Sequence, residues 1–266
     1  MSGLDAIVAL KTTSSFEFEA TVPEGWGQGR AAYGGIPGAL TLEAARLAYA
    51  RPVRSLSLNF VGPVEPGKLR ITHRKLREGK SATHCAIELS QNDSIVAASL
   101  LVLGEGRETA VQFEGRPAPR LVAPYDATPF PFIPGVTPEF TNHFEYRWTS
   151  PSFPFSGGEP KVQGWVRPKD NTTSGPAMVA ALLDAWPPPV WNLVEVPSPG
   201  SSVSWYISFQ PAAHRTDIGE GAWWSYEASL QSSHDGYAHF EGNLWNSFGE
   251  HVAISRQVFA EFSRRT

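Results

Sequence analysis

The stretch Ala177–Leu183 constrains the fold more than any other part of the chain. Its seven residues are all apolar, and most of them are good helix formers. Ser174-Gly175-Pro176 precedes the stretch and Pro187-Pro188-Pro189 follows it, so a helix is predicted over Ala177–Trp186. A helix without a polar face must be buried on every side. An antiparallel sheet that curves around the helix meets that need.

The first half of the chain repeats this plan. Tyr33-Gly34-Gly35-Ile36-Pro37-Gly38 forms a glycine-rich turn, and Ala39–Ala50 after it is predicted to be a largely buried helix with a polar edge at Glu43 and Arg46. Four β-rich segments follow each helix. They are Val53–Val61, Leu69–Leu76, Ser81–Leu89 and Ile95–Leu103 in the first half, and Ser202–Phe209, Ala222–Gln231, Ala238–Asn246 and Val252–Phe259 in the second.

The last two strands of each half superimpose without a gap at an offset of 157 residues, which places Gly79 on Gly236 and Ile95 on Val252. Between the halves, Pro117–Pro138 contains seven prolines and little periodicity, which is typical of an extended linker. We therefore predict an α+β fold of two repeats, each with a central helix wrapped by an antiparallel sheet. The predicted boundaries are 1–116 for the first repeat, 117–138 for the linker and 139–266 for the second repeat.

Composition and charge exclude several classes of protein. Hydrophobic residues make up 41% and charged residues 18%, a balance that supports a core and argues against disorder. The net charge is -4 and no basic stripe occurs, so we expect no nucleic-acid partner. The single cysteine, Cys85, excludes an internal disulfide and is predicted to be a buried thiol. Without a signal peptide or a long apolar segment, the expectation is a cytoplasmic protein with no membrane span.

Two motifs and the repeat resemble the double-hotdog acyl-CoA thioesterases, the family of bacterial thioesterase II and its peroxisomal relatives. Tyr33-Gly34-Gly35 is similar to the aromatic-Gly-Gly start of that family's first helix. Leu76-Arg77-Glu78-Gly79-Lys80-Ser81 is similar to its Leu-Arg-Asp-Gly-x-Ser hairpin. The resemblance runs from near Phe16 to Phe259. It implies a double hotdog that hydrolyses an acyl-CoA thioester to free acid and CoA by a directly activated water, with no cofactor and as a homo-oligomer.

The resemblance also implies a catalytic trio in the second half. The family's helix Asp, strand-opening Ser/Thr and last-strand Gln fall on Asp184, Ser202 and Gln257. Ser201 and Ser204 stay open as alternatives for the hydroxyl, because Ser204-Trp205 replaces the Asp-His pair that often follows it in the family. A plain turn residue after the Pro- and Gly-rich segment is the other interpretation of Ser202.

The residues themselves support parts of this site. Asp184 is the only charged residue in the second helix, where an ionised carboxylate is costly unless it is paired or hydrogen-bonded. A general base is therefore favoured over a helix-end Asp bonded to local backbone. Gln257 is an amide on a largely apolar strand, with an outward-facing polar position as the alternative. The repeat places Leu100 opposite Gln257 and Ala45 opposite Asp184, which predicts a single active site, in the second half.

The glycine-rich turn is predicted to bind substrate through Tyr33, Gly34 and Gly35. Backbone N–H groups of the two glycines, at a helix N-terminus, would approach the thioester oxygen. A tight turn packed against the sheet is the alternative. Most of the nine tryptophans lie in the second half, and at least one of them is expected to line an acyl-chain tunnel.

Two other functions stay open, a hotdog hydratase or dehydratase and a non-catalytic acyl-CoA binding protein. The absence of an Asp/His pair near the second helix disfavours the hydratase. No Gly-x-Ser-x-Gly motif occurs, which argues against an acyl-serine hydrolase. The seven histidines show no metal-ligand spacing, so no metal is expected.

Overall fold

The computed structural model describes residues 3–263. Its main feature is a 13-stranded sheet in which every neighbouring pair is antiparallel. The strands follow the order β1 (Lys11–Ser14), β2 (Glu17–Val22), β6 (Gly67–Glu78), β7 (Ala82–Gln91), β8 (Ser94–Gly104), β5 (Val53–Phe60), β12 (Gly200–Phe209), β15 (His251–Glu261), β14 (Tyr237–Trp245), β13 (Trp224–His234), β11 (Lys161–Pro168), β10 (Phe144–Trp148) and β9 (Thr128–Pro129).

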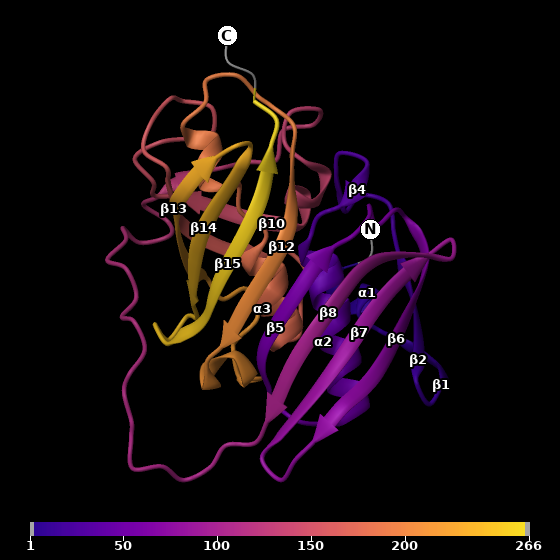
Figure 1. The fold of residues 1–266 in the computed structure, drawn as a ribbon. Helices are drawn as coiled ribbons and strands as arrows, with labels where there is room; N and C mark the ends of the chain where they lie inside the picture. Colours follow the sequence, from indigo (N-terminus) through magenta and orange to yellow (C-terminus); the bar gives the residue numbers. More distant parts are fainter. Residues whose placement is uncertain (1–2, 264–266) are drawn as a thin grey trace.

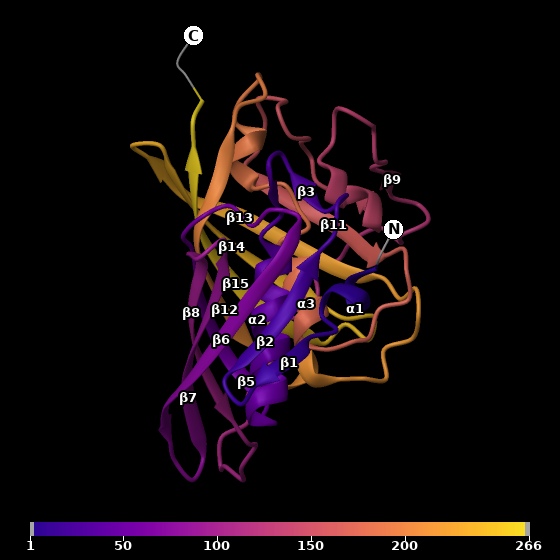
Figure 2. The ribbon, with the colours of Figure 1, turned by 90° about the vertical axis from the view of Figure 1, so that its right-hand side faces the viewer.

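The remaining elements are short, apart from one long helix. They are α1 (Leu4–Ile7), α2 (Gly35–Tyr49), α3 (Pro176–Leu183), the 3-10 turns η1 (Glu139–His143), η2 (Pro189–Asn192) and η3 (Pro211–His214), and a separate hairpin of β3 (Gly27–Gln28) and β4 (Ala31–Ala32). Figures 1 and 2 show α2 and α3 side by side on the concave side of the sheet.

The two halves of the chain meet at β5 and β12, where Leu58 lies opposite Trp205. Figure 1 shows the indigo-to-magenta strands of the first half continuing into the orange and yellow strands of the second. Ten residues of α2 and six of α3 are buried, and both helices belong to one hydrophobic core. The predicted α+β double hotdog, with each helix enclosed by a curved sheet, is confirmed.

All eight predicted strands are present, with ends that differ by a few residues. The prediction missed the strands that precede each helix, chiefly β2, β10 and β11. Each has the alternating burial of a strand with one face on the core, for example buried Phe18, Ala20 and Val22 in β2. These strands extend the sheet beyond four strands per repeat, which lets it curve around the helices.

The repeat offset of 157 matches the bounds of β8 and β15 but not the faces of their side chains. Leu100 is 57% exposed, whereas Gln257 is 5% exposed. The pair Gln91 and Ser94 closes the first hairpin, but the second is closed by Trp245 and His251 around a longer turn. A slip of one residue exchanges the two faces of a strand, so Leu100 is not the structural counterpart of Gln257.

The inward-facing residues at this level of β8 are Ser99 and Leu101, which are 5% and 1% exposed. The Ser99 hydroxyl donates to the Ile87 carbonyl oxygen at 2.8 Å. Ala45, the predicted counterpart of Asp184, is buried in α2. The first half therefore lacks a carboxamide and a carboxylate at these positions, as expected. The alignment behind that expectation was nevertheless wrong, because it matched a residue on the outer face of β8 to a residue on the inner face of β15.

The proline-rich segment Pro117–Pro138 contains one regular strand, β9, which pairs with β10 at the edge of the sheet. The Trp165 indole also donates to the Val122 carbonyl oxygen at 2.9 Å. This segment therefore packs along the second half. Cys85 is buried as predicted, and burial raises its pKa to about 12. Within residues 3–263, no helix has the length and apolar character needed to cross a membrane.

Candidate active site

Asp184 lies immediately after α3, because the helix ends at Leu183 and not at Trp186 as predicted. The Asp184 N–H still bonds the Ala180 carbonyl oxygen at 3.2 Å, so the carboxylate sits at the C-terminal end of the helix. The negative end of the helix dipole and the apolar surroundings both disfavour a charge there. Burial raises the pKa of Asp184 from 3.8 to about 6, although hydrogen bonds from Gln257 and from the backbone of Gly35 and Gly34 oppose the shift.

Gln257 joins Asp184 to Ser202 in a continuous chain of hydrogen bonds. The Ser202 hydroxyl donates to Gln257 Oε1 at 2.9 Å, and Gln257 Nε2 donates to Asp184 Oδ1 at 2.7 Å. Asp184 and Gln257 are 73 positions apart along the chain, and their convergence, which a single site in the second half requires, is confirmed; Ser202, 55 positions from Gln257, joins them. Because Gln257 is 5% exposed and faces the helices, its interpretation as an outward-facing polar residue is wrong.

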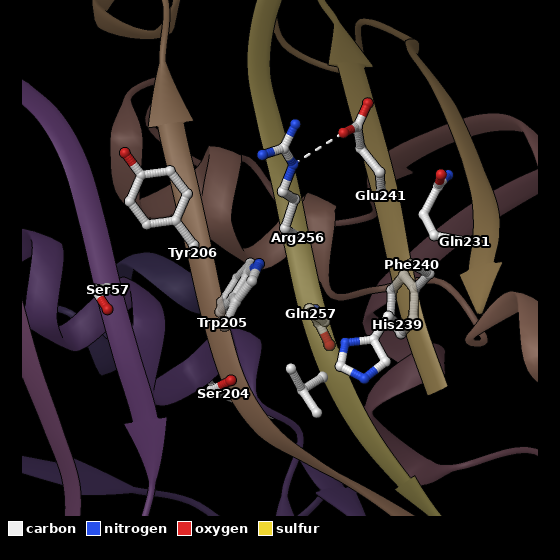
Figure 3. Close-up of a pocket in the computed structure, with 11 residues that line it drawn as sticks. Ser57, Ser204, Trp205, Tyr206, Gln231, His239, Phe240, Glu241, Arg256 and Gln257 are labelled. Carbon is white, nitrogen blue, oxygen red and sulfur yellow. Dashed lines mark hydrogen bonds and ion pairs between the residues drawn. The ribbon is translucent and has the colours of Figure 1, made fainter. Parts of the chain in front are cut away.

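A β-bulge selects Ser202 among the three candidate hydroxyls. Ser202 pairs with Phe259 while Ser204 pairs with Val258, so Val203 is an extra residue in β12. The extra residue shifts the alternation of side chains, which turns Ser202 towards Gln257. Ser204 faces the outer side of the sheet, as Figure 3 shows, and the Ser201 hydroxyl donates to the Ser202 carbonyl oxygen at 3.3 Å.

Gly34 and Gly35 lie against the Asp184 carboxylate at the N-terminus of α2. Their backbone N–H groups donate to the carboxylate, and the positive end of the helix dipole favours its negative charge. A Cβ on Gly34 would lie 2.8 Å from Asp184 Oδ2 and 2.8 Å from the Phe60 ring, so only glycine permits this approach. Contrary to the expectation, these N–H groups bond the carboxylate and are not left free for a thioester oxygen.

Tyr33 also differs from its predicted role in substrate binding. Its side chain is fully buried, and its ring stacks on Phe140 with the ring centroids 4.2 Å apart. Its hydroxyl donates to the Ala181 carbonyl oxygen at 3.4 Å. Tyr33 therefore fixes α2 against α3 inside the core and does not present its side chain to a substrate.

A small cavity adjoins the hydrogen-bonded chain. Its volume is about 20 Å³, and about 10–15 Å³ holds one water. Asp184, Ser202 and Gln257 provide its polar wall. The other residues that line it are Gln28, Leu183, Trp186, Pro188, Tyr226, Phe240 and Phe259. The arrangement can hold one water against a carboxylate whose pKa lies near neutrality.

Beyond Asp184, Ser202 and Gln257, three lining residues carry a polar group in their side chains: Gln28, Trp186 and Tyr226. Trp186 is one of the tryptophans among which a residue of an acyl-chain tunnel was expected, and it lines this cavity, which has room for one water and is not itself such a tunnel. Tyr226 gives no signal in the sequence, because a single tyrosine on a strand that packs on the core looks like any other core residue. Gln28 lies on β3, within the glycine-rich segment Gly25-Trp26-Gly27-Gln28-Gly29, to which no function was assigned from the sequence.

A larger hollow of about 270 Å³ lies on the outer face of the sheet behind Gln257. Figure 3 shows Tyr206, Arg256 and His239 projecting there, with Arg256 Nε bonded to Glu241 at 2.9 Å. Gln257 borders both spaces, but its amide is directed at Asp184 and Ser202 on the inner side. The inner cavity is therefore the candidate site in spite of its size. Across residues 3–263, no group of three or more His, Cys, Asp or Glu side chains could hold a metal ion.

The fold defines a double hotdog, and comparison with solved structures agrees. A hotdog-fold protein of unknown function from Alicyclobacillus acidocaldarius matches with a TM-score of 0.88 and 21% identity, covering 100% of both chains. An acyl-CoA thioesterase II, TesB2, from Mycobacterium marinum matches with a TM-score of 0.73 and 17% identity, covering 98% of this chain and 99% of that chain. No curated protein sequence matches the chain.

Family models resolve the identity further. Residues 124–260 match the acyl-CoA thioesterase C-terminal domain, and residues 22–104 match the acyl-CoA thioesterase N-terminal domain. The chain belongs to this acyl-CoA thioesterase family, and the protein is a thioester hydrolase.

Proposed function

We propose that the protein hydrolyses an acyl-CoA thioester to a free acid and CoA, using a water held against Asp184. One observation carries the proposal: the hydrogen-bonded chain from Ser202 through Gln257 to Asp184 borders a cavity with room for a single water. Asp184 is the only ionisable acid or base in the wall of that cavity whose pKa is near neutrality. A general base works best when its pKa lies near the operating pH.

In the first step, the water oxygen bonds the thioester carbon while one water proton passes to Asp184. The π electron pair of the carbonyl moves to its oxygen, which becomes an oxyanion. In the second step, that pair re-forms the carbonyl and the bond between carbon and sulfur breaks. The leaving sulfur takes the proton from Asp184, which restores the carboxylate. The sum is one thioester and one water converted to one acid and one thiol.

Gln257 fixes the orientation of the base. Because its Oε1 accepts from Ser202, its amide nitrogen faces Asp184 and donates to Oδ1. Each carboxylate oxygen has two lone pairs, so Asp184 retains acceptor capacity for the water after its bonds to Gln257 and the two glycines. Ser202 is thus a positioning residue, one bond further from the reaction.

The same bonds disfavour a serine nucleophile. The Ser202 hydroxyl gives its hydrogen to a carboxamide oxygen, which is not a base that could activate the hydroxyl. No histidine lines the cavity among the described residues, so the Asp/His pair wanted by a hydratase or dehydratase is missing here. A directly attacking water fits this set of groups.

The test is steady-state release of free thiol from a panel of acyl-CoAs by the wild type and by Asp184→Asn. We expect the variant to lose about 10²–10⁴-fold in kcat, the range for loss of a general base. Asp235→Asn, in the exposed turn between β13 and β14, is the matched control and should keep wild-type rates. A wild type that binds acyl-CoA without releasing thiol would favour the non-catalytic alternative, and a fully active Asp184→Asn would refute the proposed base.

A further inference from the structure

Three buried tyrosines surround Asp184, and one of them differs from the other two. Tyr33 donates its hydroxyl to the Ala181 carbonyl oxygen at 3.4 Å, and Tyr146 donates to the Ala185 carbonyl oxygen at 3.0 Å. The third, Tyr226, is 2% exposed, and its hydroxyl makes no hydrogen bond to another of residues 3–263. Its oxygen is not one of the fully enclosed polar atoms that lack a partner, so it borders space that a water or a substrate oxygen can occupy.

The Tyr226 side chain lines the same cavity as Asp184, Ser202 and Gln257. The neighbouring strand makes room for its hydroxyl, because a Cβ on Gly242 would lie 2.9 Å from that oxygen. Burial, and to a smaller extent the charge of Asp184, raise the pKa of Tyr226, so the phenol stays protonated and able to donate.

Trp186 provides a second donor at the same place. Its ring stacks on Tyr226 with the centroids 5.1 Å apart and the planes within 5°. Trp186 is 6% exposed and lines the cavity, and its indole N–H also lacks a partner within the described part of the chain. The two rings thus form one stacked pair that lines the same cavity as the Asp184 carboxylate, and neither ring's polar hydrogen bonds a described residue.

Hydrolysis of a thioester places negative charge on the carbonyl oxygen, and that charge needs hydrogen-bond donors. The N–H groups of Gly34 and Gly35 are already bonded to Asp184. We propose that the Tyr226 hydroxyl and the Trp186 indole N–H donate to the thioester carbonyl oxygen and stabilise its charge as the water attacks. The inference rests on the proposed function. No proton leaves either donor: the oxygen gains the π electron pair and returns it when the carbon–sulfur bond breaks.

Tyr226→Phe tests the inference, with Tyr146→Phe as the matched control. Removal of one oxyanion donor costs about 10²–10³-fold in kcat, which is the loss expected for Tyr226→Phe, while KM should rise by no more than the about 3–10-fold that one hydrogen bond to the carbonyl contributes. Its melting temperature should stay close to that of the wild type, because the lost hydroxyl bonds no other described residue. Tyr146→Phe should show the reverse, a lower melting temperature with kcat preserved, because it strips the Ala185 carbonyl oxygen of its donor. Trp186→Phe should lower kcat in the same way as Tyr226→Phe.

A binding measurement separates this inference from the proposed function. An S-(2-oxoalkyl)-CoA keeps a carbonyl but cannot be hydrolysed, whereas an S-alkyl-CoA of equal length has no carbonyl. Wild-type protein should bind the ketone about 3–10-fold more tightly, the gain from one hydrogen bond, and Tyr226→Phe should lose this preference. If the wild type releases thiol and Tyr226→Phe is equally fast, the inference fails and the proposed function stands. If the ketone preference depends on Tyr226 but no thiol is released, the proposed function fails. A wild type without any ketone preference overturns the inference.

Discussion

Asp184 should make the stability of the fold depend on pH in a direction opposite to that of most carboxylates. Its pKa is raised from 3.8 to about 6 by burial, so the native state keeps a proton that the unfolded chain has already lost. The free energy of unfolding therefore falls as the pH rises through this interval. At about 1.4 kcal/mol per pKa unit the effect reaches at most about 3 kcal/mol, because part of the side chain still contacts solvent.

Asp184→Asn removes this titration and isolates its contribution. Urea unfolding of both proteins from about pH 4 to about pH 7 gives the difference in unfolding free energy as a function of pH. As the pH rises across that range, we expect the unfolding free energy of the variant to increase relative to that of the wild type by up to about 3 kcal/mol, even though the variant loses turnover. A difference that stays constant with pH, or one that moves in favour of the wild type, would show that Asp184 is not a carboxylate with a raised pKa.

Three further outcomes follow from the same geometry. The pH profile of kcat/KM should fall tenfold per pH unit below the Asp184 pKa of about 6, because a protonated carboxyl cannot accept the water proton; activity that persists unchanged at lower pH would exclude this base. Gly34→Ala should lose at least about 10²-fold in thiol release, since its Cβ would displace the carboxylate from a distance of 2.8 Å; near-normal rates would mean that this contact is not needed. Ala45→Ser and Leu100→Met should leave the rates of folded protein within about threefold, and a large loss from either would place chemistry in the first half.

Much of the fold followed from the apolar helix. Ala177–Leu183 has no polar face, so a helix there has to be enclosed, and a curved sheet is the simplest way to enclose it. A second, largely buried helix at Ala39–Ala50 predicted a second unit of the same kind. The strands that precede each helix were missed, although Glu17–Val22 alternates clearly enough to be recognised. The prediction that Leu100 corresponds to Gln257 was wrong because the length of the turn sets the register of the strand that follows it. When the length of the turn is unknown, the sequence does not say which residues of that strand face the core.

The candidate site was predictable where residue type alone carries information. A lone carboxylate beside an apolar helix and a carboxamide on an apolar strand identified Asp184 and Gln257. Ser202 could not be separated from its neighbours, because the bulge at Val203 depends on pairing with β15. The unpaired hydroxyl of Tyr226 emerges only from three-dimensional packing, since its distinction from other buried tyrosines is the absence of a partner within the described residues.

If a water attacks the thioester directly, with Asp184 as its base, the oxygen of that water ends in the released acid. A single turnover in H₂¹⁸O with enzyme in excess over acyl-CoA, followed by mass spectrometry of the acid and of the peptide that carries Asp184, tests this route most directly. Direct attack by water gives one ¹⁸O atom in the released acid and none in the peptide. An acid that carries only ¹⁶O, with ¹⁸O in the Asp184 carboxylate, would reveal a covalent acyl-enzyme and contradict the account.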